Sequence, residues 1–212
     1  SKLVKLRDFK IKPKWFLRQA GRHIPEYFSI RNKHRDFIDF CLDERSIINA
    51  TILPLKYYNI DAAILFSDIL LLPHFLGQKV TFKKKIGPVL KEINLNENFF
   101  NKDIDLNDFT SIKKAIFEIK QALPPSKDLI GFCGAPWTLA CYMIEGGSSK
   151  DYAKTRTCLW NNEKIFFKLI NKLTKICADF LEYQYLAGCT VLMIFDTWSS
   201  MIPDRYWVKF GI

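Results

Sequence analysis

Four short runs of consecutive apolar residues, each followed by polar or small residues, are the strongest pattern in this chain. They are Trp15–Leu17, Ala62–Phe66, Leu129–Cys133 and Val191–Phe195. Apolar runs of this length between turn residues are typical of strands that are buried on both faces of a parallel sheet. The pattern therefore predicts four buried strands.

Between these runs, apolar residues recur every three or four positions, which predicts helices. The clearest helix is expected over residues 163–187, and a second over 111–123. A third is expected over 43–58, where Pro54 should bend or break it. The Lys-, Asn- and Asp-rich stretch 83–108 is expected to form an excursion or a hairpin with a loop.

Alternation of strands and helices predicts an α/β fold with right-handed crossovers. Polar residues stand directly after the predicted strands: Arg18, Asp68, Gly134 and the pair Asp196–Thr197. Ligands of parallel α/β folds bind at the carboxyl ends of the strands, so these positions are candidates for a site. Four strands are too few for a barrel of eight, which leaves a small open sheet or the first half of a larger fold.

The composition excludes several classes of protein. The 212 residues are 49% hydrophobic and 25% charged, which excludes a disordered or low-complexity chain. No apolar stretch approaches the roughly 18 residues of a membrane span, and the first residues lack the apolar core of a secretory signal. The six cysteines form no Cys-x-x-Cys pair, which argues against a zinc site or a disulfide framework. We therefore expect a globular cytoplasmic protein without a membrane partner.

The positive charge is concentrated at the start of the chain. Residues 1–35 hold eleven Lys or Arg and two acidic residues, which makes +9 of the net +10. Such a segment attracts anions, and nucleic acid is the usual first candidate.

Two of the motifs carry charged residues that are candidates for a site. In the segment RQAGR, Arg18 and Arg22 stand four residues apart around small residues, so they can converge on one anion or lie in an exposed loop. Asp68 follows an apolar run, and a buried carboxylate must meet cations or hydrogen-bond donors. A helix cap is the alternative role for Asp68.

The glycine-rich segment 131–150 carries Tyr142 but matches neither a phosphate loop nor a dinucleotide fingerprint. Its spacing alone indicates a tight turn and close packing.

Four segments together closely resemble the uroporphyrinogen decarboxylase family. They are RQAGRHIPEY at 18–27, DAAILFSDIL at 61–70, GFCGAPWTLACYMIEGGSSK at 131–150 and IFDTW at 194–198. The resemblance covers essentially the whole chain, residues 1–212, as one incomplete domain. It implies a (β/α)8 barrel of the TIM type, of which this chain would hold the N-terminal half, about four of eight βα units. The late Gly-His segment of the family is absent from the chain.

The resemblance implies decarboxylation of the four acetate side chains of uroporphyrinogen to methyl groups, which gives coproporphyrinogen in haem biosynthesis. The family uses no cofactor and no metal. Protonation of a pyrrole carbon creates a cation that accepts the electrons of the breaking C–CO2 bond. The enzyme must then supply a proton donor, a counter-charge and cationic clamps for carboxylates.

The motif match implies a role for each candidate residue. It implies catalytic roles for Asp68, Arg18 and Tyr142, with Asp68 as the counter-charge of the pyrrole cation. Arg18 and Arg22 would bind substrate carboxylates. The remaining implied substrate-binding residues are Gln19, Ala20, Gly21 and Thr197.

The resemblance also changes the interpretation of the basic segment, because uroporphyrinogen carries eight carboxylates. We expect this substrate, rather than nucleic acid, as the partner, and a homodimer for a complete protein. A half barrel leaves strand edges unpaired, so we expect the chain alone to be inactive and to self-associate or aggregate.

Two rival functions remain. One is a corrinoid- or cobalamin-linked methyltransferase of the same superfamily, which metal analysis would distinguish. The other is a non-enzymatic basic domain that binds polyanions, with steeply salt-dependent affinity for nucleic acid.

Overall fold

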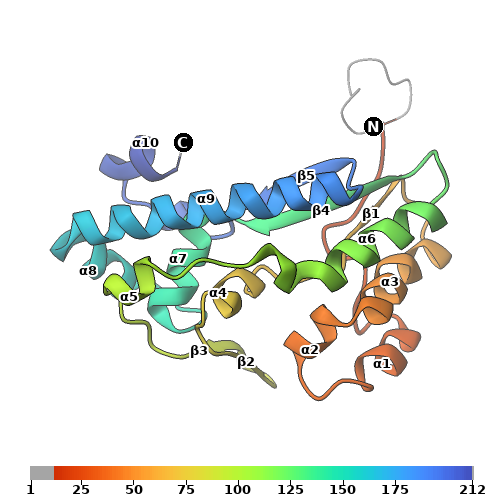
Figure 1. Cartoon of the computed structure of the whole chain (residues 1–212), viewed down its shortest axis with the longest axis horizontal. Helices are drawn as coiled ribbons and strands as arrows, with labels where there is room; N and C mark the ends of the chain where they lie inside the picture. The colour runs from red at the N-terminus through yellow and green to blue at the C-terminus, as the bar shows by residue number, and fades with distance from the viewer. Residues whose placement is uncertain (1–11, 212) are drawn as a thin grey trace. The chain divides into compact units, whose positions relative to one another are not determined.

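The computed structural model describes residues 12–211, and its main sheet has three strands (Figure 1). The strands are β1 (Ala62–Ile64), β4 (Asp128–Gly134) and β5 (Val191–Phe195), in the order β1-β4-β5. β1 and β4 are parallel, with Ala62 opposite Asp128. The predicted α/β class with a parallel sheet is therefore confirmed, and three of the four predicted strands form.

Backbone hydrogen bonds connect β5 to β4 at both ends. The amide of Thr190 donates to the carbonyl of Leu129 at 2.9 Å, and the amide of Ala135 donates to the carbonyl of Phe195 at 2.9 Å. Residue numbers increase together along both strands, so β5 runs in the same direction as β4. The carboxyl ends of these two strands therefore lie at the same edge of the sheet.

Helices occupy the connections that the periodicity predicted. α6 (Thr110–Ala122) and α9 (Glu163–Ala187) confirm two of them. α3 (Glu44–Ile52) ends before Pro54, which lies in the 3-10 turn η1 (Leu53–Lys56). The other α-helices are α1 (Pro25–Arg31), α2 (Phe37–Leu42), α4 (Leu71–Phe75), α5 (Glu97–Phe100), α7 (Pro136–Glu145), α8 (Ala153–Asn161) and α10 (Trp207–Phe210). Further 3-10 turns are η2 (Leu106–Phe109), η3 (Ser199–Met201) and η4 (Asp204–Tyr206).

The polar excursion begins with a hairpin (Figure 1). β2 (Val80–Lys83) and β3 (Gly87–Leu90) pair antiparallel, so the hairpin starts three residues before the predicted stretch 83–108. The hairpin turn includes Lys85, whose φ of 66° is left-handed.

The prediction of a strand over residues 15–17 is wrong. Lys14 exchanges two hydrogen bonds with Asp61: its amide donates to the carboxylate and its carbonyl accepts from the Asp61 amide, both at 2.7 Å. Phe16 and Leu17 are 54% and 53% exposed, and the structure assigns no strand there. The segment therefore lies beside the start of β1 without a continuous backbone ladder, which a strand requires.

The expected burial of β5 on both faces is also wrong. Leu192 and Ile194 are 37% and 58% exposed, whereas most of β4 is buried. Leu192 and Ile194 point to the same face, because side chains alternate along a strand. No described residue covers that face of β5 well enough to bury them.

The described chain divides into two compact units. The first comprises residues up to Asp68 together with Leu106–Phe132 and Leu181–Met193; the second comprises Ile69–Asp105, Cys133–Phe180 and the residues from Ile194 onward. In the first unit, a core of Ile24, Tyr27, Phe40, Ala50 and Leu53 packs against Ala20 and Phe66, among others. In the second unit, the ring of Phe166 packs against Trp137 and Phe210, with centroids 5.4 Å away in each case.

All six cysteines are free, and five of them are buried. Across residues 12–211, none of the helices has both the length and the apolar composition that a membrane crossing requires.

Candidate functional site

The RQAGR segment forms a loop that leads into α1 in the first unit. The amide of Ile24 donates to the carbonyl of Gly21 at 3.0 Å, and Pro25 then begins α1. Arg18 and Arg22 are exposed, whereas Ala20 packs against the core of the unit. The loop therefore turns its small residue inward and leaves both guanidinium-bearing residues accessible to an anion.

Gln19 attaches this loop to β1. Its side chain is 2% exposed; Nε2 donates to the carbonyl of Ala62 at 2.9 Å, and Oε1 accepts from the amide of Ile64 at 3.2 Å. The Gln19 amide thus takes the place of a neighbouring strand at two residues of β1. The resemblance implied a substrate contact for Gln19, and the structure shows its side chain engaged with the backbone.

Asp68 lies four residues beyond β1 and is partly buried. The strand exit before it is anchored by Thr51 of α3, whose hydroxyl accepts from the amide of Phe66 at 2.9 Å. Burial raises the pKa of the Cys41 thiol well above its usual value, and the negative charge of Asp68 adds to that shift. Asp68 therefore lies close enough to the buried thiol of α2 to act on it.

Arg22 acts on the same part of the core. Burial is the main cause that raises the pKa of Tyr27; Cys41 adds to the shift, and Arg31 and then Arg22 oppose it. Arg22 thus lowers the pKa of Tyr27, whereas Cys41 raises it, and Asp68 in turn raises the pKa of Cys41. The first unit accordingly holds all the predicted charged residues, with Arg22 and Asp68 near one aromatic core.

The second unit holds the two predicted hydroxyl residues. Tyr142 is partly buried on α7, and Thr197 is exposed in the turn after β5. The ring of Trp198, the residue after Thr197, meets the Tyr142 ring edge-on, with centroids 6.0 Å apart. The turn that carries Thr197 therefore contacts the residue that the resemblance pairs with it.

Thr138 of α7, which the sequence did not single out, joins this turn by two hydrogen bonds. Its side chain is fully buried; Oγ1 donates to Oδ1 of Asp196 at 2.6 Å and accepts from the amide of Trp198 at 3.1 Å. The indole of Trp137 donates to the carbonyl of Trp198 at 3.0 Å. A hydroxyl in the otherwise apolar run PWTLAC was the one signal that could have identified Thr138.

The glycines of the segment 131–150 serve packing and turns, as their spacing indicated. A Cβ at Gly131 would lie 2.8 Å from Oε1 of Gln184, so glycine allows α9 to approach β4 closely. Gly146 ends α7 with a left-handed φ of 80°. A Cβ at Gly147 would lie 2.8 Å from the carbonyl oxygen of Pro88.

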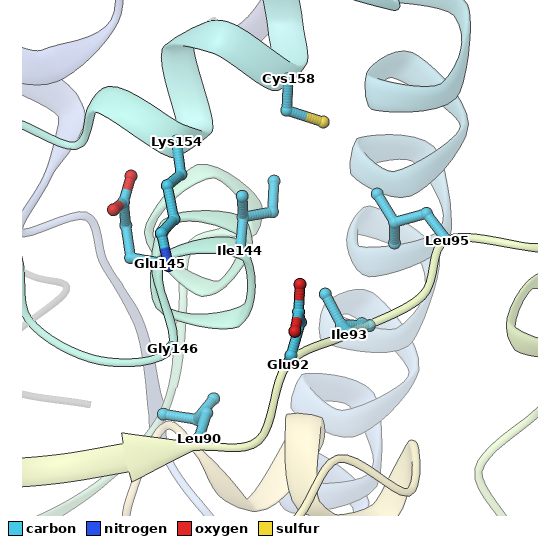
Figure 2. A pocket seen from close by; sticks show the side chains of 9 residues that line it. All are labelled: Leu90, Glu92, Ile93, Leu95, Ile144, Glu145, Gly146, Lys154 and Cys158. Carbon is cyan, nitrogen blue, oxygen red and sulfur yellow. The ribbon is translucent and has the colours of Figure 1, made fainter.

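A cavity of about 480 Å³ lies within the second unit (Figure 2). Figure 2 shows side chains from α7, from α8, from the end of β3 and from the segment after it around the same space. Its lining residues are Leu90, Glu92, Ile93, Leu95, Ile144, Glu145, Gly146, Lys154 and Cys158. None of the predicted site residues lines it. Within residues 12–211, no three His, Cys, Asp or Glu side chains are grouped as metal ligands.

Part of the basic N-terminal segment lies outside the described residues, namely Lys2, Lys5, Arg7 and Lys10. Among the described basic residues, Arg31 has structural contacts. Its guanidinium lies 5.8 Å from the ring centroids of Phe37 and Phe40, and Nη1 donates to the carbonyl of His34 at 3.0 Å. At least one charge of the segment therefore packs against the core.

Fold and site together define an α/β protein with a parallel sheet, in which Asp68 and Thr197 follow the carboxyl ends of β1 and β5. The family description "Uroporphyrinogen decarboxylase (URO-D)" matches residues 3–212. The chain belongs to the uroporphyrinogen decarboxylase family.

Curated relatives agree with this assignment. The chain is 40% identical to a uroporphyrinogen decarboxylase of Rickettsia felis over 201 residues, which are 94% of this chain and 58% of the relative. It is 40% identical to that of Rickettsia massiliae over 210 residues, 99% of this chain and 60% of the relative. The chain thus spans 58–60% of the length of these relatives.

The fold is shared with a solved structure of a methyltransferase from Methanosarcina mazei. The TM-score is 0.74 over 99% of this chain and 62% of the methyltransferase, at 12% sequence identity. At this identity the likeness concerns the fold alone.

Proposed function

We propose that this chain serves the decarboxylation of the four acetate side chains of uroporphyrinogen, which gives coproporphyrinogen. The observation that carries the proposal is the attachment of the arginine loop to β1 through Gln19. It connects two exposed guanidinium residues to the strand that leads to Asp68, within one unit. Membership of the family supports the choice of substrate.

The first unit supplies the charges that this chemistry needs. Arg18 and Arg22 pair with carboxylates of the substrate, since guanidinium groups form bidentate hydrogen bonds with carboxylates. A proton added to the pyrrole α-carbon next to the carbon that bears the acetate creates a cation, and the electrons of the C–CO2 bond form an exocyclic double bond as CO2 leaves. A proton added to this methylene group and a proton lost from the α-carbon then give the methyl group. The carboxylate of Asp68 stabilises that cation, which lowers the barrier because the positive charge develops in the transition state. Arg18 also contributes to catalysis, while Ala20 and Gly21 allow the loop backbone to approach the substrate.

The second unit supplies hydroxyl groups. Tyr142 and Thr197 donate hydrogen bonds to the substrate. The contact between the Trp198 and Tyr142 rings supports a joint role for these two residues. No cofactor is needed in this scheme, because the protonated pyrrole itself accepts the electron pair.

We further propose that the complete architecture is a (β/α)8 barrel, of which residues 1–212 form part of a single domain. The strand order β1-β4-β5 supports it, because the strands of a parallel barrel lie side by side in chain order. The intervening strands β2 and β3 form a separate hairpin. The exposed Leu192 and Ile194 of β5 support it too, since a barrel interior would cover one face of each strand. The resemblance also supports a cytoplasmic location and a homodimer. Sedimentation of a complete protein would test the homodimer.

Replacement of Asp68 by Asn tests the proposed function. D68N removes the negative charge at nearly constant shape, so coproporphyrinogen formation should fall by about 100-fold or more, as when one electrostatic stabiliser is lost. Binding of uroporphyrin, the oxidised form of the substrate, should change far less. Turnover is measured in a full-length context by chromatography of the porphyrins, and binding is measured by fluorescence titration of the chain.

The exposed Asp108 of the same unit offers the matched control, and D108N should leave both quantities unchanged. Turnover by D68N near that of the unmodified enzyme would contradict the role of Asp68. Binding of RNA as tight as binding of uroporphyrin, with steep salt dependence, would instead favour a general polyanion-binding domain.

A further inference from the structure

The turn after β5 is held to α7 on both sides of Thr197. Before Thr197, the Asp196 carboxylate accepts a hydrogen bond from the hydroxyl of Thr138 at 2.6 Å. After it, the backbone of Trp198 is bound twice: its amide donates to Thr138 Oγ1 at 3.1 Å, and its carbonyl accepts from the Trp137 indole at 3.0 Å. One buried hydroxyl thus connects the two residues that flank Thr197.

The same helix carries Tyr142, four residues after Thr138. Residues four apart on a helix lie on the same face, one turn apart. The Trp198 ring contacts Tyr142 with centroids 6.0 Å apart and Tyr152 with centroids 4.8 Å apart. The turn is therefore attached to α7 through the Trp198 backbone at one point and through its ring at another.

We propose that Thr138 is a positioning residue, whose hydroxyl fixes the Asp196–Trp198 turn and thereby sets where Thr197 lies relative to Tyr142. The proposal rests on the proposed function, because it assumes that Tyr142 and Thr197 contact the substrate. Thr138 does not itself reach the substrate, since its side chain is fully buried.

The chemistry of the hydroxyl explains why threonine is needed at this place. A hydroxyl can donate one hydrogen bond and accept another, and Thr138 does both. Valine has almost the same shape but can do neither, so T138V leaves a carboxylate oxygen and an amide without their partner. Serine keeps both hydrogen bonds and loses only a methyl group.

The experiment compares T138V, T138S and T155V in the full 212-residue chain. Thr155 is the matched control, because it is also fully buried in the second unit and its hydroxyl bonds to a carboxylate, Oε1 of Glu145, at 3.0 Å. T155V therefore removes a comparable hydrogen bond that involves neither Asp196 nor Trp198. Two quantities are measured on folded protein: hydrogen exchange of the Trp198 amide and the Kd for uroporphyrin.

For T138V, the protection of the Trp198 amide should fall about tenfold or more, and the Kd should rise about tenfold. In T138S, both values should lie within about threefold of those of the unmodified chain. T155V should change neither the exchange of the Trp198 amide nor the Kd. A merely structural role would not produce this pattern, because T155V should cost similar stability.

Equal Kd values for T138V and the unmodified chain, with the turn loosened, would overturn the positioning role alone. An equal rise of the Kd in T138V and T155V would overturn it as well. If the unmodified chain binds no uroporphyrin, the proposed function fails, and the role of Thr138 fails with it. An unchanged exchange rate of the Trp198 amide in T138V would refute the inference, because it would show that the Thr138 hydroxyl does not hold the turn.

Discussion

Gln19 contributes to the arrangement of the arginine loop through backbone contacts rather than through a ligand. Its amide binds Ala62 and Ile64, so Arg18 on one side of Gln19 and Arg22 on the other are attached to β1 by a single side chain. Loops tolerate movement unless such contacts hold them. We therefore expect the proposed anion binding by the two arginines to depend on Gln19, whose side chain bonds to the backbone of β1.

Replacement of Gln19 by Leu should weaken both stability and binding. Two buried backbone groups of β1 would lose their partners, which should lower the free energy of unfolding by about 2–3 kcal/mol. The Kd for uroporphyrin should rise about tenfold, because the loop that carries the arginines is released. Urea unfolding and fluorescence titration measure the two effects.

Gln184 provides the control for that prediction. It is also fully buried, and its amide bonds in the same way to one strand residue, the amide and the carbonyl of Phe132 at 2.9 and 3.0 Å. Q184L should lower stability to a similar extent and leave the affinity almost unchanged. Equal weakening of binding in both variants would show that the effect of Q19L is only a loss of stability.

Single residues of the candidate site were predictable from the sequence to different degrees. Arg18, Arg22 and Asp68 stand in motifs whose charged residues are already candidates for a site. The partners of Gln19 and Thr138 were not predictable, because their hydrogen bonds reach residues 43 and 58 positions away. Local patterns contain no information about which distant backbone group a side chain meets.

Among the elements, periodicity predicted the long helices α6 and α9 but not the shorter helices α1, α2, α4, α5, α8 and α10. α9 follows the expected bounds because a long amphipathic repeat is a strong signal. Three apolar residues at 15–17 were too weak a signal, since whether they form a strand depends on a neighbouring ladder. The exposure of Leu192 and Ile194 was also not predictable, because an apolar run does not show whether anything covers it.

The connection between α7 and the hairpin leads to a prediction for Gly147. Its φ is 153°, it forms an isolated bridge with Val89, and a Cβ would lie 2.8 Å from the Pro88 carbonyl oxygen. G147A should therefore force β3 away from this turn and lower the free energy of unfolding by about 3 kcal/mol. Urea unfolding monitored by circular dichroism measures it.

Gly87, which begins β3 directly after the turn of the same hairpin, separates the two causes of this loss. Its φ of 96° is also left-handed, but a Cβ at this position would meet no neighbouring atom within 4 Å. G87A should lower the free energy of unfolding by about 1 kcal/mol, the cost of a left-handed backbone for a residue with a Cβ. If G87A proved as destabilising as G147A, the clash with Pro88 would not be the cause.

At the scale of the whole molecule, several buried groups make the free energy of unfolding depend on pH in the alkaline range. Burial is the main cause that raises the pKa of Cys141, Tyr152 and Cys189 to about 12, from usual values of 9.0 for a thiol and 10.0 for a phenol. Between the two values the unfolded chain has lost the proton and the native chain keeps it. These three groups should therefore leave stability unchanged below about pH 9 and should lower it as the pH rises toward 12.

The size of that fall follows from proton linkage. Each group that keeps its proton only in the native state lowers the free energy of unfolding by up to about 1.4 kcal/mol per pH unit. C141A removes one such group and should flatten the curve measured by urea unfolding from pH 8 to 11. An unfolding free energy that stays constant over this range would contradict the prediction.

The amide of Gln19 also has a consequence for assembly. It bonds to the carbonyl of Ala62 and the amide of Ile64, which face away from β4. These two groups of β1 are therefore not free to pair with a further strand. A foreign strand that tried to dock there would first have to displace a buried side chain. We therefore expect an added strand to pair with the sheet at the β5 edge more readily than at these two residues of β1.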